Sequence, residues 1–272
     1  MALLRAGKER SAESLFTIAS TIDTPDNRSF GMRSLAYLEM YRGRYRESVP
    51  LLEQAATITE SERSLLSAAR NRWLLASAYL DLGDLTQARQ QLDRSESILG
   101  SLAVSPAYLY YLASLRLRTG DVTGARRLQR RLEASAHSQR PEERSPVALL
   151  RGMLLLYEGR PDSAIAEVRK CSGYTWFPFR DDILSQAYEG LARPDSALAS
   201  AQRLDSTWSF GYEAQRLWRH GSLRVARLAL RSGDTVLARA AGGRQLQRWE
   251  RGDADLPDLL RAKALVGRLD AR

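Results

Sequence analysis

The residues that most often carry chemistry are scarce in this chain of 272 residues. It has two histidines, His137 and His220, and one cysteine, Cys171. These three side chains cannot supply the four Cys and His ligands of a structural zinc site. A lone cysteine also forms no intrachain disulfide bond. The sequence therefore predicts no metal site and no catalytic centre built on these residues.

Two groups of aspartates have a spacing that a metal ion could use. Asp181 and Asp182 are adjacent, and Asp253, Asp255 and Asp258 lie close together near the C-terminus. Both groups fall near the expected beginnings of helices, where carboxylates interact favourably with the helix dipole. We interpret both groups as helix N-terminal residues and not as metal ligands.

Sequence motifs of common enzyme classes are missing as well. The chain has no phosphate-binding loop of the G-x-x-x-x-G-K-[ST] type and no G-x-G-x-x-G dinucleotide motif. It has no G-x-S-x-G nucleophile motif. We therefore expect a protein without enzymatic activity and without a cofactor.

The strongest pattern is a turn residue followed five positions later by a small residue, which occurs seven times. The small residues of successive pairs are 33 to 41 positions apart. A period in this range is typical of helical hairpins stacked into a solenoid. The pairs are Gly7/Ala12, Gly43/Ser48, Gly83/Ala88, Gly120/Ala125, Gly159/Ala164, Ala192/Ala197 and Gly233/Ala238.

The segment 67–98 shows the pattern in detail. Apolar and small residues recur at helical spacing up to Leu80, and Gly83 then ends the helix. Asp84 is placed to cap a second amphipathic helix. Two helices can cross closely only where a small side chain lies at the crossing, and Ala76 and Ala88 occupy these positions. The identical strings Arg-Pro-Asp-Ser-Ala at 160–164 and 193–197 place proline in the first helical turn, where it is preorganised.

These positions resemble the tetratricopeptide repeat, which has small residues at its eighth and twentieth positions and a glycine near its fifteenth. The resemblance extends over essentially the whole chain. Trp73 is shifted by one position from the tryptophan of the family's first helix, and the units are longer than the family's roughly 34 residues. The resemblance implies an all-α, right-handed superhelical solenoid of helix-turn-helix repeats.

We expect a single solenoid over residues 1–272. Its last helix should have one apolar side formed by Leu259, Leu260, Ala264, Val266 and Leu269. We interpret residues 1–6 as the end of a helix that began earlier, which predicts that the chain is a fragment of a longer protein. The expected divisions are a partial repeat over about 1–24, repeats over 25–59, 60–100, 104–138, 144–174, 178–206 and 208–252, and a capping helix over 255–271.

The C-terminal quarter, from Trp208 to Leu269, has a second resemblance. It is similar to the C-terminal repeat arrays of bacterial proteins that join tetratricopeptide repeats to a protein kinase or a DNA-binding activator domain. This resemblance implies an effector domain N-terminal to residue 1. The expected function is a non-catalytic protein–protein interaction scaffold of a bacterial signalling or regulatory protein. The alternative is a ligand- or peptide-sensing arm of a transcriptional regulator or Ser/Thr protein kinase.

Composition limits the kinds of partner. The net charge is +9, and three of the 41 basic residues are lysines. The arginines often lie beside acidic residues, so we expect a mixed-charge surface and no specific nucleic-acid binding. Arginine-rich, lysine-poor usage is typical of a GC-rich bacterial genome. No segment approaches the ~20 apolar residues that cross a bilayer, and no signal peptide begins the chain. We expect a cytoplasmic protein without membrane insertion.

The expected partner is a protein or peptide segment bound in the concave groove that first helices line in such solenoids. Aromatic and arginine side chains are frequent interface anchors. The alternatives are that the aromatic residues fill the core between repeats and that the arginines are solvated. The candidate groove residues are Arg33, Tyr37, Tyr41, Trp73, Ser77, Tyr110, Tyr111, Ser114, Arg118, Tyr157, Arg224 and Arg227.

A second candidate surface lies between two of the expected hairpins. Tyr174, Trp176, Phe177 and Phe179 concentrate four aromatic side chains within six residues. They either pack between repeats or form an exposed aromatic patch that grips a peptide or a neighbouring domain.

Overall fold

The structure is a computed structural model that describes residues 4, 6–135, 141–207 and 214–271. Within these residues all regular secondary structure is helical, and no strand is present. His137 and Trp208 lie outside the described residues. The predicted all-α class is confirmed.

The helices are α2 (Glu9–Thr21), α3 (Pro25–Tyr41), α4 (Tyr45–Ser61), α5 (Leu65–Leu82), α6 (Leu85–Leu99), α7 (Pro106–Arg118), α8 (Val122–Ser135), α9 (Pro141–Tyr157), α10 (Pro161–Val168), the short 3-10 helix η1 (Tyr174–Trp176), α11 (Phe177–Gly190), α12 (Pro194–Ser206), α13 (Ala214–Arg231), α14 (Thr235–Arg248) and α15 (Pro257–Asp270).

The seven predicted turn residues all adopt the left-handed backbone conformation. Their φ angles run from 54° at Ala192 to 87° at Gly83. Glycine reaches this conformation without the steric cost of a Cβ atom. The small residues five positions later, from Ala12 to Ala238, are at most 1% exposed. The periodic pattern in the sequence thus marks both the turn of each hairpin and a buried small residue on its second helix.

The second helices begin as their sequences predict. Asp84, Asp121 and Asp234 each accept a hydrogen bond, at 2.8–2.9 Å, from the backbone N–H three residues later. Such a bond satisfies one of the N–H groups that a helix leaves unpaired at its N-terminus. Pro161 and Pro194 are the first residues of α10 and α12.

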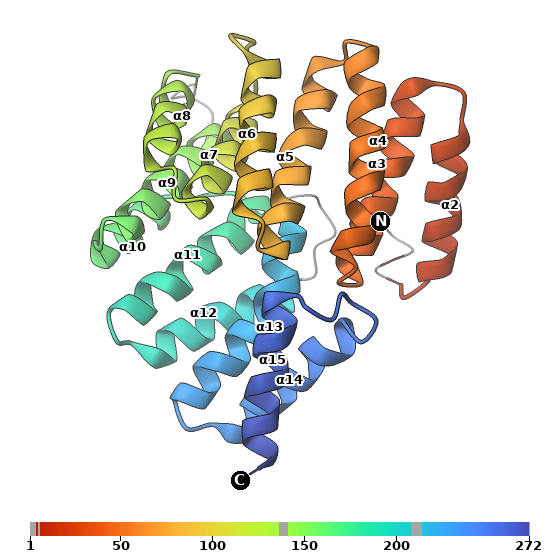
Figure 1. Cartoon of the computed structure of the whole chain (residues 1–272). Coiled ribbons are helices and arrows are strands. Elements are labelled where there is room, and N and C mark those ends of the chain that lie inside the picture. Colours follow the sequence, from red (N-terminus) through yellow and green to blue (C-terminus); the bar gives the residue numbers. More distant parts are fainter. Residues whose placement is uncertain (1–3, 5, 136–140, 208–213, 272) are drawn as a thin grey trace. The chain divides into compact units, whose positions relative to one another are not determined.

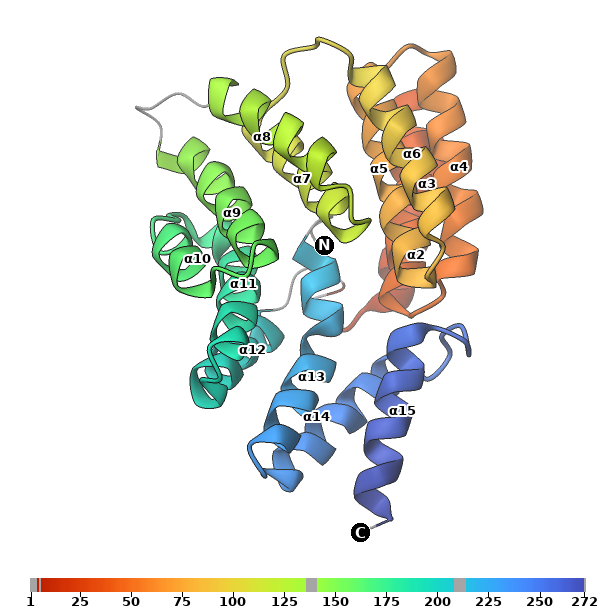
Figure 2. The ribbon, with the colours of Figure 1, turned by 60° about the vertical axis from the view of Figure 1, so that its left-hand side comes forward.

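The helices divide into two compact units. Unit 1 comprises Met1–Leu102 and Arg248–Pro257, and unit 2 comprises Ala103–Gln247 and Asp258–Arg272. In unit 1, helices α2 to α6 lie side by side (Figures 1 and 2). Large side chains such as Tyr37, Leu52 and Leu75, each at most 1% exposed, fill the space between them.

A buried polar network also joins the helices of unit 1. The fully buried Asn71 on α5 donates to the backbone oxygen of Ala55 on α4 at 2.9 Å, and to the hydroxyl groups of Ser29 and Thr59. Its oxygen accepts from Arg33 on α3 at 3.2 Å. Because buried polar groups must be paired, this network sets the relative positions of three consecutive helices.

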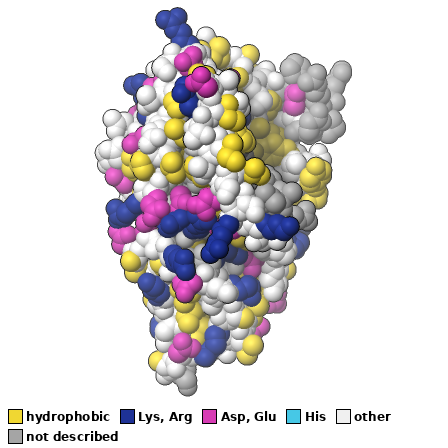
Figure 3. All heavy atoms as spheres, turned by 90° about the vertical axis from the view of Figure 1, so that its right-hand side faces the viewer, with side chains coloured by type: hydrophobic (Ala, Val, Ile, Leu, Met, Phe, Trp, Pro, Cys, Tyr) yellow, Lys and Arg dark blue, Asp and Glu magenta, His cyan; other side chains and the backbone are white. Residues whose placement is uncertain are grey.

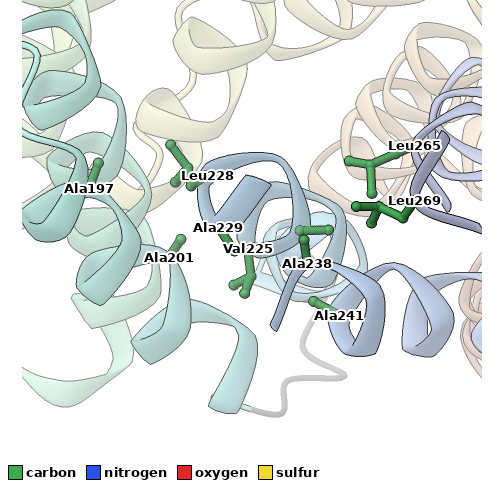
Figure 4. Packing of buried hydrophobic residues seen from close by; sticks show 10 residues of the cluster. Ala197, Ala201, Val225, Leu228, Ala229, Ala238, Ala241, Leu265 and Leu269 are labelled. Atoms are coloured by element: carbon green, nitrogen blue, oxygen red, sulfur yellow. The ribbon is translucent and has the colours of Figure 1, made fainter. Parts of the chain in front are cut away.

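Unit 2 has a core of small side chains where α12, α13, α14 and α15 meet. Ala197, Ala229, Ala238 and their neighbours pack together there (Figure 4). A Cβ atom at Gly242 on α14 would lie 2.7 Å from Val266 on α15. These helices are therefore closely packed and leave little room for larger side chains.

The apolar side of α15 differs from the predicted one. Leu259, Ala262, Leu265 and Leu269 are buried, whereas Leu260 is 50% exposed. The predicted face was wrong because the helix has apolar residues on more than one side. Packing against α13 and α14 selects the side that is buried. Among the described helices, none is long and apolar enough to cross a membrane.

Candidate interaction surface

Aromatic residues from three elements of unit 2 form one cluster, which we call the aromatic cluster. It consists of Tyr110 and Tyr111 on α7, Trp176 on η1 and Phe179 on α11. Tyr110 meets Trp176 and Phe179 edge to face, with ring centroids 5.7 and 5.5 Å apart. Tyr111 stacks on Trp176 at 6.0 Å. The structure thus brings together residues that the sequence assigned to two separate surfaces.

Most of the aromatic cluster is buried. Tyr110, Trp176 and Phe179 are 2%, 9% and 7% exposed, and Tyr111 is half-buried. Burial raises the pKa of the Tyr110 hydroxyl well above its usual value of 10.0. Edge-to-face ring contacts add stability beyond the burial of area. The cluster therefore serves as a rigid support inside unit 2.

Two aromatic side chains on the same segment as Trp176 and Phe179 remain accessible. Tyr174 is 83% exposed and Phe177 is 37% exposed. The guanidinium carbon of Arg180 lies 4.1 Å from the centroid of the Phe177 ring, a cation–π geometry. We call Tyr174 and Phe177 the aromatic margin. It presents large apolar rings on a segment anchored by the buried Trp176.

The groove residues of unit 1 are mostly internal. Arg33, Tyr37 and Trp73 are 7%, 1% and 3% exposed, while Tyr41 and Ser77 are partly accessible. Arg33 bonds Asn71 within the buried network. These three side chains fill the space between helices and do not line an open surface, because both sides of α3 and α5 are packed against neighbours.

Apart from the buried Tyr110, the groove residues of unit 2 are partly accessible. Ser114 and Arg118 on α7 are half-buried, and Tyr157 at the end of α9 is 57% exposed. Arg224 on α13 pairs with Asp182 on α11. Arg227, also on α13, pairs with Glu189 of the same neighbouring helix. These two arginines are thus already neutralised by acids of the adjacent first helix.

The predicted role of the two aspartate groups needs correction. Asp181 and Asp182 lie in the second turn of α11 and not at its N-terminus. Asp181 is 4% exposed and pairs with Arg203 on α12 at 3.2 Å. Only Asp258 occupies the first turn of a helix as predicted. No group of three or more His, Cys, Asp or Glu residues that could hold a metal occurs in the described part of the chain.

The two remaining reactive side chains are also placed by packing. Cys171 is buried, and burial raises the pKa of its thiol. A thiol with a raised pKa is a poor nucleophile. His220 on α13 contacts the carboxylate of Asp258, which also pairs with Arg261 at 2.6 Å.

Basic side chains on the surface lie close to acidic ones. Figure 3 shows Lys and Arg side chains interspersed with Asp and Glu on one face. At the end of α3, Arg42 binds Glu9 and Glu13 of α2 at 3.0 and 2.7 Å. The hydrogen bond from Arg42 lowers the pKa of Glu13. Ion pairs with acidic residues therefore neutralise part of the basic surface, and the net charge of +9 is the excess of basic over acidic residues.

Comparisons with known proteins agree with this architecture. A sequence model described as tetratricopeptide repeat matches residues 69–98. A search of curated proteins found no match. A chain of the APC/C hetero-tetramer Cut9–Hcn1 is 12% identical, with a TM-score of 0.50, over 98% of this chain and 47% of that chain.

Two other solved structures are similar over most of this chain. The TPR2AB domain of yeast Sti1, in its complex with pHSP90, is 14% identical with a TM-score of 0.37, over 99% of this chain and 95% of that chain. A signal transduction ATPase with a tetratricopeptide repeat sensor, from Pyrococcus horikoshii, is 13% identical with a TM-score of 0.47. That match covers 96% of this chain and 41% of the ATPase.

At 12% identity, the similarity to the Cut9–Hcn1 chain shows a shared fold and nothing finer. This chain spans less than half of the Cut9–Hcn1 chain and of the ATPase. The sequence match covers α5 and α6, one of the helical hairpins of unit 1. Residues 69–98 match the tetratricopeptide-repeat model, and the helical hairpins around them have the fold of tetratricopeptide-repeat solenoids.

Proposed function

We propose that this protein is a non-catalytic protein–protein interaction scaffold and that it binds a protein or peptide segment at the aromatic margin. The observation that carries this proposal is the exposure of Tyr174 and Phe177 on the same segment as the buried Trp176 and Phe179. Exposed apolar side chains that are held in place contribute strongly to binding, since little conformational entropy is lost when a partner docks. Tyrosine is also frequent among the residues that dominate interface energies.

The test is a double substitution at the margin. Tyr174→Ala with Phe177→Ala should weaken binding of a partner, recovered by cross-linking with the wild-type chain, by roughly 2 kcal/mol or more. Val236→Ala is the matched control, because Val236 is 80% exposed and lies on α14. Helix content and thermal midpoint should not change in either variant.

The same experiment separates the margin from the groove. Tyr157 is an exposed groove residue, and Tyr111, Ser114 and Arg118 are half-buried ones. If Tyr157→Ala and Arg118→Ala abolish binding while the double margin variant binds normally, the groove is the site and the margin proposal fails. Comparable losses at both places would indicate one extended surface.

Within this proposal, we assign the protein to the cytoplasm and to bacterial signalling or regulation. Arginine-rich, lysine-poor composition and the likeness of the C-terminal quarter to kinase-linked and activator-linked repeat arrays support it. Expression from its own promoter, followed by cell fractionation, tests the compartment. Recovery of the protein only in a membrane or secreted fraction would contradict the cytoplasmic assignment.

A second candidate is a ligand- or peptide-sensing arm attached to an effector domain such as a Ser/Thr kinase or a DNA-binding regulator. The observation that favours it is a run of exposed apolar residues on and directly after α2: Leu15 and Ile18 on the helix and Ile22 after its end are 56%, 59% and 40% exposed. Leu15 lies three residues after the small residue Ala12. The residues at the same position in α8, α12 and α14, which are Leu128, Ser200 and Ala241, are buried. Another apolar surface could cover these exposed residues, as exposed apolar patches often mark interaction sites.

The DNA directly upstream of the Met1 codon tests this candidate. A kinase or DNA-binding domain in the same reading frame would favour the sensing arm. A stop codon without such a domain would contradict it and leave the scaffold proposal untouched.

A further inference from the structure

The segment between α14 and α15 packs on the turn between α3 and α4, about two hundred residues earlier in unit 1. Trp249 is 1% exposed. Its ring meets Tyr45 edge to face, with centroids 6.1 Å apart. A Cβ atom at Gly43 would lie 2.8 Å from Cγ of Trp249. The indole therefore occupies space that only a glycine at position 43 leaves open.

Hydrogen bonds fix the backbone of this segment on the same turn. The N–H of Asp253 donates to the carbonyl oxygen of Gly43 at 3.0 Å. The carboxylate of Asp253 accepts from the backbone N–H of Arg46 at 3.0 Å. The side chain of Arg46 also pairs with Asp255. Leu256, at the end of the segment, is 2% exposed.

The carboxylate of Asp253 replaces a missing helix cap. The helices α6 and α14 are capped by their own aspartates, whereas the N-cap residue of α4 is Arg44, which makes no side-chain cap hydrogen bond. Arg46 is the second residue of α4, and its N–H belongs to the group that a helix leaves unpaired at its N-terminus. A residue 207 positions away in sequence thus caps α4.

We propose that the α3–α4 turn is a recognition site for an acidic turn that carries a tryptophan, and that residues 249–256 occupy it in the free chain as a releasable clasp. The tryptophan enters beside Gly43, and the first aspartate caps α4. The second aspartate pairs with Arg46 in an exposed ion pair, with both side chains 63% accessible. Because exposed ion pairs are weak and screened by salt, the indole and the cap supply most of the recognition. This site is distinct from the aromatic margin.

The experiment uses the full chain with the clasp broken by Trp249→Ala and Asp253→Ala. A fluorescein-labelled peptide of residues 247–258 is titrated with this variant and with the wild type, and binding is followed by fluorescence anisotropy. We expect binding to the variant at least tenfold tighter than to the wild type, whose own segment fills the site at high effective concentration. A peptide with Trp249→Ala should bind the variant at least tenfold more weakly.

Alanine substitutions at Gly43, in the α3–α4 turn where the peptide is expected to bind, and at Gly159 provide a matched comparison. Gly43→Ala, added to the clasp-broken chain, should reduce peptide binding at least tenfold, because its Cβ atom collides with the indole. Gly159 has a similar φ of 72°, but a Cβ atom there would meet nothing within 4 Å. Gly159→Ala should therefore leave peptide binding unchanged despite the same backbone strain.

Three results would overturn the proposal. The peptide could fail to bind a clasp-broken chain that keeps its helix content. It could also bind equally well to clasp-broken chains with glycine and with alanine at position 43. A wild-type chain that is dimeric at micromolar concentration and exchanges its C-terminal segments would assign the occupant to a second copy.

A further measurement applies if the clasp-broken chain loses its helix content. Hydrogen exchange of residues 248–257 is then compared in otherwise wild-type chains with Gly43→Ala and with Gly159→Ala. Faster exchange of this segment in the first variant alone supports the clasp, and equal exchange in both rejects it. Neither result depends on Tyr174 or Phe177, so the scaffold proposal is tested separately.

Discussion

Glu189 on α11 accepts hydrogen bonds from both terminal nitrogens of Arg227 on α13. The Nη2···Oε2 distance is 2.7 Å. Arg231 pairs with the same carboxylate. The hydrogen bonds from Arg227 are the main reason why the pKa of Glu189 lies below its ordinary value of 4.5. Two consecutive first helices of unit 2 are thus joined by an ion pair that depends on ionisation of one carboxyl group.

Glu189→Gln should therefore reduce stability in a pH-dependent way. Because the folded-state pKa of Glu189 is lower than its unfolded value, the pair stabilises the fold above about pH 4.5. That contribution is lost as the pH falls through the folded-state pKa. Thermal scans by circular dichroism should show a lower midpoint for the variant near neutral pH and a smaller difference in acid. Glu62→Gln, at an exposed position after α4, is the control; an equal effect there would exclude a specific role for Glu189.

Enlarging the small residues at the helix crossings should destabilise the fold. Ala88 and Ala164 are fully buried, so Ala88→Leu or Ala164→Leu would overpack the contact and cost roughly 1–3 kcal/mol. Urea denaturation measures the change in free energy of unfolding. Ala166→Leu is the control, because Ala166 lies on the same helix as Ala164 and is exposed. Unchanged midpoints for both buried variants would contradict the assigned repeat register.

Loss of the buried Asn71 amide should lower the free energy of unfolding. Asn71→Ala removes one hydrogen-bond partner from each of Ser29, Thr59 and Arg33. Losing several buried hydrogen bonds at once costs about 1–3 kcal/mol. Asn27→Ala, whose amide bonds only Thr24 at an exposed position, should have little effect. Similar urea midpoints for the two variants would show that the network adds nothing to stability.

We expect no specific nucleic-acid binding despite the net charge of +9. Pairs such as Arg42 with Glu13 interrupt any continuous track of positive charge that could follow a phosphate backbone. Gel shifts with mixed DNA and RNA fragments, run at increasing salt, test this. A shifted band that persists at physiological ionic strength and depends on the fragment's sequence would be incompatible with this expectation.

Sequence alone could not tell anchoring residues from core residues on the first helices. Trp73 and Tyr110 have the residue types of interface anchors, yet both are nearly fully buried. In a solenoid each first helix packs against its partner helix and its neighbours, so most of its circumference is covered. Trp73→Ala with Tyr110→Ala is therefore expected to reduce stability, by about 3–5 kcal/mol at Trp73 alone. The accessible Tyr174 is the more selective place to test binding.

The sequence by itself determined the hairpins. Each depends on a local signal, such as Gly83 with its left-handed turn, Asp84 as helix cap and Ala88 at the crossing, and these act within a few residues of one another. Only the tertiary structure decided which side of α15 is buried and that Asp253 caps α4. It also decided that Trp249 fills the space beside Gly43. Those contacts join residues far apart in the chain, so no local spacing records them, and they arise only when packing has brought the two segments together.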